Sequence, residues 1–268
     1  MRCKHTSNKR GFTLLEILIA LAIMGVVTAA VMQAYVTQHE NYLVQEDISD
    51  MQQNARASLD ELVRNVRMAG YDLPPTLSAI RAANTNPDTI TITYTSSSCE
   101  SFLRSDMMSG SEALPCSLSV ACFNDLEWCY IYDPDSGGGE WLQVSGVDAA
   151  NRQLDHTSTP LSTPYRAGSV VRPINQIKYF IDTTDSEHPN LMMQRLGSTP
   201  QVYAEDISDL QFRYRMKNGS IIDEPILVDN IREVLISIRG RSQTLNIGSD
   251  SRRQREFVTS VSLRNLGN

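Results

Sequence analysis

The sequence predicts an α+β fold, in which a long, partly transmembrane N-terminal helix packs on a C-terminal antiparallel β-sheet head. An uncharged run over residues 17–38, followed by apolar residues at three- and four-residue intervals, predicts the helix. A switch to alternating apolar and polar residues after Pro75 predicts the sheet. The composition agrees, because 41% hydrophobic and 21% charged residues are typical of a globular protein, not of a disordered or multi-span chain.

The charge distribution disfavours general nucleic-acid binding. The formal net charge is −7, but four of the 24 basic residues lie in the first ten positions. Without those four, 20 basic and 31 acidic residues remain, and the net charge becomes −11. A chain this acidic repels polyanions as a whole.

The first forty residues predict a single membrane crossing. The uncharged run has 22 residues, and a bilayer core requires about 20 apolar residues in a helix. Basic residues precede the run and acidic residues follow it, so the positive-inside rule places the N-terminus in the cytoplasm. A secretory signal peptide cleaved near Ala34 is the alternative. Glu16 disfavours it, because a carboxylate among lipid tails costs a few kcal/mol and usually marks a functional contact.

Residues 11–16, Gly-Phe-Thr-Leu-Leu-Glu, follow a short basic leader and resemble the processing motif of type IV prepilins. The resemblance implies that a prepilin peptidase and methyltransferase cuts between Gly11 and Phe12, removing residues 1–11 with Cys3, and methylates Phe12. It also implies that Glu16 pairs with the amine of Phe12 in a neighbouring subunit. Pairing offsets the cost of a desolvated charge, so this contact would set the axial register between subunits.

The helix is expected in two parts: residues 12–37 cross the membrane and form the filament core, and residues 38–71 form an amphipathic helix. If it is unbroken up to the predicted C-cap at Gly70, its 58 residues span about 87 Å. Two helices joined near residues 36–46 are the alternative. An apolar stripe marks the amphipathic part: Tyr42, Ile48, Met51, Ala55, Leu59, Leu62, Val66 and Ala69.

Residues 76–268 are expected to form the β-rich head. Alternation predicts strands at 90–94, 210–216, 234–238 and 259–263, and further strands are expected at 128–132, 140–144, 168–172, 176–182 and 191–196. Asn218 and Gly219 predict a tight turn. Half-buried strands favour an antiparallel sheet with one face covered, and the amphipathic helix is the natural cover.

This layout resembles the type IV pilin fold. Residues 51–62 and 67–71 are similar to the stalk signature of PilW-type minor pilins, and residues 261–265 to the last strand of that group and of J-type minor pseudopilins of type II secretion. The resemblance implies a minor pilin that joins other minor pilins and the major pilin, primes assembly and reaches the cell surface. A J-type pseudopilin is the nearest alternative. A tip-exposed module that contacts a surface or DNA through the cysteine-bearing insertion, residues 99–140, is another.

Four cysteines of the head lie within 31 residues: Cys99, Cys116, Cys122 and Cys129. Disulfides are expected in an exported domain, and three pairings remain open. A zinc site is the rival interpretation, but the spacing contains no Cys-x-x-Cys pair.

The remaining candidates are weaker. Asp133, Asp135 and Glu140 are possible calcium ligands, but a wide hairpin turn explains their Pro, Ser and Gly neighbours equally well. The arginine-rich segment 232–264 fits a polyanion contact, pairing with acidic subunits or a solvated face. The histidines of the processed chain, His39, His156 and His188, are well separated, so neither an enzyme nor a cofactor is expected.

Overall fold

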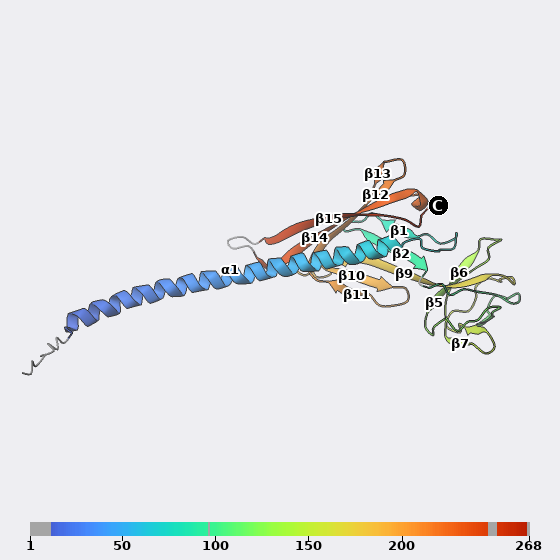
Figure 1. The fold of residues 1–268 in the computed structure, drawn as a ribbon, viewed down its shortest axis with the longest axis horizontal. Helices are drawn as coiled ribbons and strands as arrows, with labels where there is room; N and C mark the ends of the chain where they lie inside the picture. Colours follow the sequence, from blue (N-terminus) through green and yellow to red (C-terminus); the bar gives the residue numbers. More distant parts are fainter. Residues whose placement is uncertain (1–11, 96, 246–250, 267–268) are drawn as a thin grey trace, which may run out of the picture. The chain divides into compact units, whose positions relative to one another are not determined.

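The computed structural model describes residues 12–95, 97–245 and 251–266. Gly11, Cys3 and the rest of the leader lie outside the described residues. Contacts divide the chain into two compact units, residues 1–49 and 50–268. The predicted α+β class is confirmed: a long N-terminal helix packs against antiparallel sheets (Figure 1).

Helix α1 (Leu14–Met68) is a single helix of 55 residues. No break occurs near residues 36–46, so the unbroken helix is confirmed over the two-helix alternative. Its interior contains no proline, which removes the commonest cause of a kink.

The C-terminal end of α1 is held by the sheet and by the end of the chain. Gly70 has φ +78°, the left-handed conformation expected at a helix C-cap. Its N–H donates to the carbonyl of Thr93 at 3.0 Å. A Cβ at this position would lie 2.6 Å from Leu266 Cδ2. Glycine is therefore required here both by the backbone conformation and by the close approach of the C-terminal segment.

The described residues of the second unit form three antiparallel sheets. The largest follows the order β1 (Ile80–Ala83), β2 (Thr89–Thr95), β9 (Val170–Asp182), β10 (Asn190–Arg195) and β11 (Gln201–Ala204). Strand β9 also pairs with β3 (Ser101–Phe102) and with β5 (Trp128–Tyr132). Strand β5 in turn pairs with β6 (Gly139–Gln143). The second follows the order β13 (Ile221–Ile222), β12 (Ile207–Met216), β14 (Ile231–Leu245) and β15 (Arg252–Ser262). The third follows the order β4 (Ala113–Pro115), β8 (Gln153–Asp155) and β7 (Gly146–Asp148).

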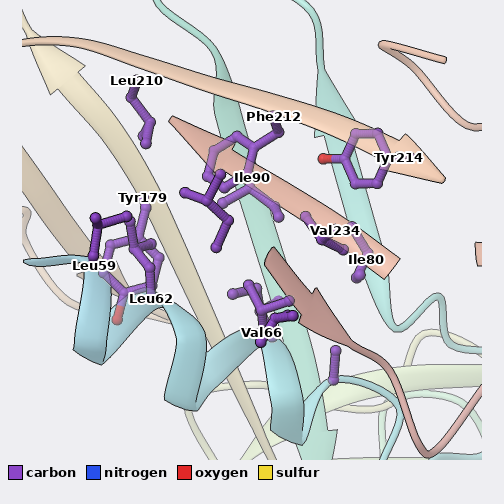
Figure 2. Packing of buried hydrophobic residues seen from close by; sticks show 14 of the residues in the cluster. Leu59, Leu62, Val66, Ile80, Ile90, Tyr179, Leu210, Phe212, Tyr214 and Val234 are labelled. Atoms are coloured by element: carbon purple, nitrogen blue, oxygen red, sulfur yellow. The ribbon is translucent and has the colours of Figure 1, made fainter. Parts of the chain in front are cut away.

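The main core lies between the C-terminal part of α1 and the two larger sheets (Figure 2). Leu62 and Val66 are fully buried and face Ile90 and Phe212. Burial of each such side chain contributes about 1.5–3 kcal/mol. A hydrogen bond also crosses this interface: Asn65 Nδ2 donates to the Tyr179 hydroxyl at 2.7 Å. The amphipathic helix is thus the cover that the strand pattern predicts.

A glycine on β14 allows the helix to lie close to the second sheet. A Cβ on Gly240 would lie 2.9 Å from Met51 Cγ and 3.6 Å from Ala55 Cβ. Contacts below 3.0 Å force a neighbour to move, so a larger residue would displace the Met51 side chain.

A second core fills the region that carries the cysteines. It joins residues of β4, β5, β6, β8 and the first part of β9 with residues of the segments between strands: Cys99, Leu103, Leu114, Cys116, Val120, Phe123, Cys129, Ile131, Leu142, Val144, Leu154, Leu161, Tyr165 and Val171. This core continues well past residue 140. The predicted insertion is therefore part of a larger packed subdomain.

The sequence pattern predicted two strands where the structure has one. Residues 170–172 of the first predicted segment and all of segment 176–182 lie in β9, whose first part pairs with β5 and whose remainder pairs with β2 and β10. Pro173 interrupts the alternation without ending the strand. Seven short strands were not predicted (β1, β3, β4, β7, β8, β11 and β13), because two to four residues carry too little periodicity. The predicted turn at Asn218 and Gly219 is confirmed, with Gly219 at φ +88°.

Candidate processing and assembly site

The start of α1 carries a reciprocal cap between Thr13 and Glu16. The Thr13 N–H and hydroxyl donate to Glu16 Oε2 at 2.8 and 3.0 Å. In return, the Glu16 N–H donates to Thr13 Oγ1 at 3.3 Å. This is a capping box, which satisfies N–H groups that a helix N-terminus leaves without partners. Within one chain, Glu16 therefore stabilises its own helix.

The cap engages only one oxygen of the Glu16 carboxylate. Both hydrogen bonds end on Oε2, and no donor within the described residues reaches Oε1. A carboxylate accepts through both oxygens, so Oε1 remains available to a donor from another molecule. Phe12, which would carry the new amine after processing, is 85% exposed.

The helix around this carboxylate presents an apolar surface. Its most apolar window has a mean hydropathy of 2.5 and no buried residue, and by length and composition it is able to cross a membrane. A shallow hollow of about 400 Å³ contains Glu16 as its one charged group among the described residues; it is lined by Phe12, Glu16, Ile17, Ala20, Leu21 and Met24. An exposed surface of this kind requires lipid or other apolar helices as its surroundings.

The structure pairs two of the four candidate cysteines. Cys99 and Cys122 form a disulfide, whereas Cys116 and Cys129 are fully buried free thiols. Burial raises the pKa of the Cys116 thiol, and burial with the nearby Glu127 carboxylate raises that of Cys129 well above its usual range. A protonated, buried thiol is a poor nucleophile. These two residues thus act as core side chains in this structure.

The candidate calcium ligands are used inside the fold. Asp133 Oδ1 accepts the N–H of Asp135 at 2.9 Å, within the β5–β6 hairpin turn. Glu140 accepts the hydroxyl and the N–H of Ser162 at 2.7 and 2.9 Å. No group of three or more His, Cys, Asp or Glu side chains suited to a metal ion occurs in the described part of the chain.

The arginine-rich segment does not form one patch. Arg239 pairs with Asp209 at 3.7 Å, and Arg252 pairs with Glu187 at 2.7 Å. Arg255 lies over the ring of Phe257, with 5.6 Å to the centroid. Along β15, Arg252 and Arg253 lie on opposite faces of the sheet and Arg255 shares the face of Arg253, because side chains alternate along a strand.

The three histidines have separate partners. The structure stacks His39 on Tyr35 in α1, buries His156 with its Nδ1 2.9 Å from the carbonyl of Thr159, and places His188 Nδ1 3.3 Å from Asp206.

Sequence reasoning missed Thr13, the residue that engages Glu16. The Thr-x-x-Glu spacing at the start of an apolar helix was the signal that could have identified it.

Comparison with known proteins identifies the same N-terminal segment. Residues 6–32 match the family model described as the prokaryotic N-terminal methylation motif. No curated protein matches the chain. The matched residues contain Gly11, Phe12, Thr13 and Glu16. The motif and the apolar helix support a type IV pilin-like protein that is anchored in a membrane and processed by a prepilin peptidase.

Proposed function

We propose that this protein is a minor pilin of the PilW type, which enters a type IV pilus through its N-terminal helix and primes assembly. Residues 1–11 are the cleaved leader, residues 12–37 the membrane and filament-core segment, residues 38–71 the amphipathic stalk and residues 76–268 the head. Before assembly, the N-terminus faces the cytoplasm and the head lies outside the bacterial inner membrane. Other minor pilins and the major pilin are the expected neighbours.

The proposal rests on the Glu16 carboxylate, which uses one of its two oxygens within its own helix. Its Oε2 caps its own helix, and Oε1 has no donor within the described residues. The side chain lies in an exposed apolar surface. The amine of Phe12 in an adjacent subunit could bind Oε1 at only one axial offset between the two helices. Apolar packing would then drive association, and the ion pair would set that axial offset.

The test is incorporation of Glu16 variants into filaments. Glu16→Gln keeps the length and the capping oxygen but removes the charge, and Glu16→Ala removes both. We expect both variants to insert into the membrane like the wild type and to fall at least about tenfold in sheared filaments, because a partly desolvated charge pair contributes a few kcal/mol.

Thr13→Ala is the matched control, because it removes the hydroxyl of the cap and leaves the carboxylate in place. It should reduce incorporation far less than Glu16→Gln. Wild-type incorporation of Glu16→Gln would refute the proposed charge pairing.

Two alternative functions differ from this proposal, one in the filament that the protein joins and the other in the role of the head. A J-type pseudopilin would be found in a secretion pseudopilus and not in a surface pilus, so co-purification with one of the two filaments decides between them. For the tip-exposed module, deleting residues 99–140 is not a clean test, because β5 pairs with β9 and supplies the second core. Met108 is exposed, so its substitution by serine should leave the fold intact. A loss of surface binding with normal assembly would then support the module.

A further inference from the structure

Three ring-bearing residues lie on one face of α1, where its apolar run ends. Tyr35, His39 and Tyr42 are four and three residues apart, so their side chains form one row along the helix. Tyr35 is 65% exposed and Tyr42 is 63% exposed. The rings of Tyr35 and His39 are stacked, with 6.2 Å between their centroids and 5° between their planes. These three residues are called the aromatic face below.

The opposite face of the same helical turns is polar. Gln33 lies nine residues before Tyr42, which is two and a half turns, so the two side chains point in opposite directions. Thr37 and Glu40 share the side of Gln33, because they follow it by four and seven residues. The aromatic face, in contrast, carries no carboxylate until Glu46.

The boundary between apolar and polar residues therefore runs obliquely across α1. It falls at Gln33 on the polar face and beyond Tyr42 on the aromatic face, about 14 Å further along the axis. A membrane surface is flat on this scale, so an oblique boundary matches it only when the helix is tilted. The uncharged run of 22 residues allows a tilt, because it spans about 33 Å and the hydrocarbon core about 30 Å.

The chemistry of the aromatic face favours lipid headgroups over a second apolar helix. No described residue forms a hydrogen bond with the hydroxyls of Tyr35 and Tyr42 or with the ring nitrogens of His39. A dry contact with an apolar helix would bury these polar groups without partners, which is unfavourable. At a bilayer interface the ring bodies contact acyl chains, and the polar groups bind water, ester carbonyls and phosphates. The aromatic face also continues the helix that is apolar enough to cross a membrane.

We infer that the aromatic face of α1 lies in the lipid headgroup region and holds the helix in the bilayer at a tilt toward this face. Tyr35 and Tyr42 are the anchors, and His39 packs against Tyr35 between them. Gln33 and Thr37 then face water on the other side of the helix. The inference rests on the membrane anchor; it goes beyond the minor-pilin proposal and does not depend on leader cleavage or on Glu16.

The test uses the full chain in phosphatidylcholine vesicles, with nitroxide spin labels on introduced cysteines. Cys3→Ser removes the leader thiol, and this parent gives the background from the buried Cys116 and Cys129. His39→Cys places a label on the aromatic face, and Thr37→Cys places one nearly opposite. Collisions with oxygen report lipid, and collisions with a water-soluble nickel chelate report water. We expect an oxygen-to-nickel ratio at least about fivefold higher at position 39 than at position 37.

Removing the anchors should abolish this difference. With Tyr35→Ser and Tyr42→Ser together, nothing holds the helix toward the aromatic face, so the two ratios should agree within about twofold. Gln33→Ser with Asn41→Ser is the matched control, because it changes two exposed side chains on the polar side of the same turns. The control should keep the difference, and circular dichroism verifies that both double variants remain helical.

Three outcomes would overturn the inference. Equal or reversed ratios at positions 37 and 39, with both tyrosines present, would show that the helix does not lean toward this face. A difference that survives the loss of both tyrosines would show that they are not the anchors. Spin–spin broadening at position 39 in lipid-rich vesicles would show a second helix on this face instead of lipid. The Glu16 variants should keep the wild-type ratios, which separates this result from the proposed function.

Discussion

Asp88 shows how one buried carboxyl group makes the stability of the head depend on pH. Its side chain is 3% exposed, and Oδ2 accepts the N–H of Phe212 at 2.8 Å. Oδ1 is buried, and no described residue forms a hydrogen bond with it. Burial raises the pKa of Asp88 above its usual range, the Phe212 N–H opposes that shift, and the nearby Asp209 and Asp223 carboxylates add to it.

The sign of the pH effect follows from the raised pKa. The folded chain holds this proton more tightly than the unfolded chain, so the stabilising contribution is complete below about pH 4 and is lost as pH rises through the folded pKa. Asp88→Asn should remove this loss. In urea unfolding, the free energy of unfolding of the variant should rise relative to that of the wild type between pH 4 and pH 7, because the variant has no carboxyl group to ionise. Exposed Asp229→Asn, which changes the charge equally, should show no such gain; a parallel response of both variants contradicts the assignment.

The cysteines give a second prediction at the residue scale. In the processed chain, alkylation should label no thiol under native conditions and two thiols after denaturation, because Cys116 and Cys129 are buried and free. Reduction before alkylation should raise the number to four by opening the Cys99–Cys122 bond. Intact-mass measurement counts the labels. Absence of label in the denatured, unreduced chain would show a second disulfide instead.

At the scale of elements, the contact between α1 and β14 depends on the absence of a side chain. Gly240→Ala places a Cβ 2.9 Å from Met51 Cγ and should lower the free energy of unfolding by about 1–3 kcal/mol. The control is Gly138→Ala, where the nearest atom outside the adjoining residues is Ser136 Oγ at 3.6 Å, an ordinary contact. Chemical denaturation measures both. Equal stability of the two variants would mean that the helix adjusts without cost.

Sequence periodicity predicted the long elements and failed on the short ones, for a physical reason. The C-terminal part of helix α1 and strands β12 and β14 bury one face along many residues, so their pattern repeats often enough to be recognised. Strand β9 changes partners along its length and therefore changes its buried pattern. Short strands such as β3 form because a neighbour is already in place, and no local pattern records that neighbour.

At the scale of the whole molecule, N-terminal processing is the event that completes the proposed assembly site. Mass spectrometry of the membrane-extracted protein should identify methylated Phe12 as the first residue. Gly11→Leu should abolish cleavage, because the motif requires a small residue before the cut, and the leader should then remain attached. A mature product that begins near Tyr35 would instead show signal-peptide cleavage and would remove both the apolar helix and Glu16.

The sequence by itself determined the processing motif, the apolar run, the apolar stripe of the amphipathic helix, the helix end at Gly70 and the alternation of the main strands. Each of these is a pattern of residues that are close together in the chain. Only the tertiary structure decided that Cys99 joins Cys122, that Gly240 lies against the helix and that β15 lies at the edge of its sheet. Those features depend on which distant segments meet, and contacts between distant segments leave no periodic trace along a single chain.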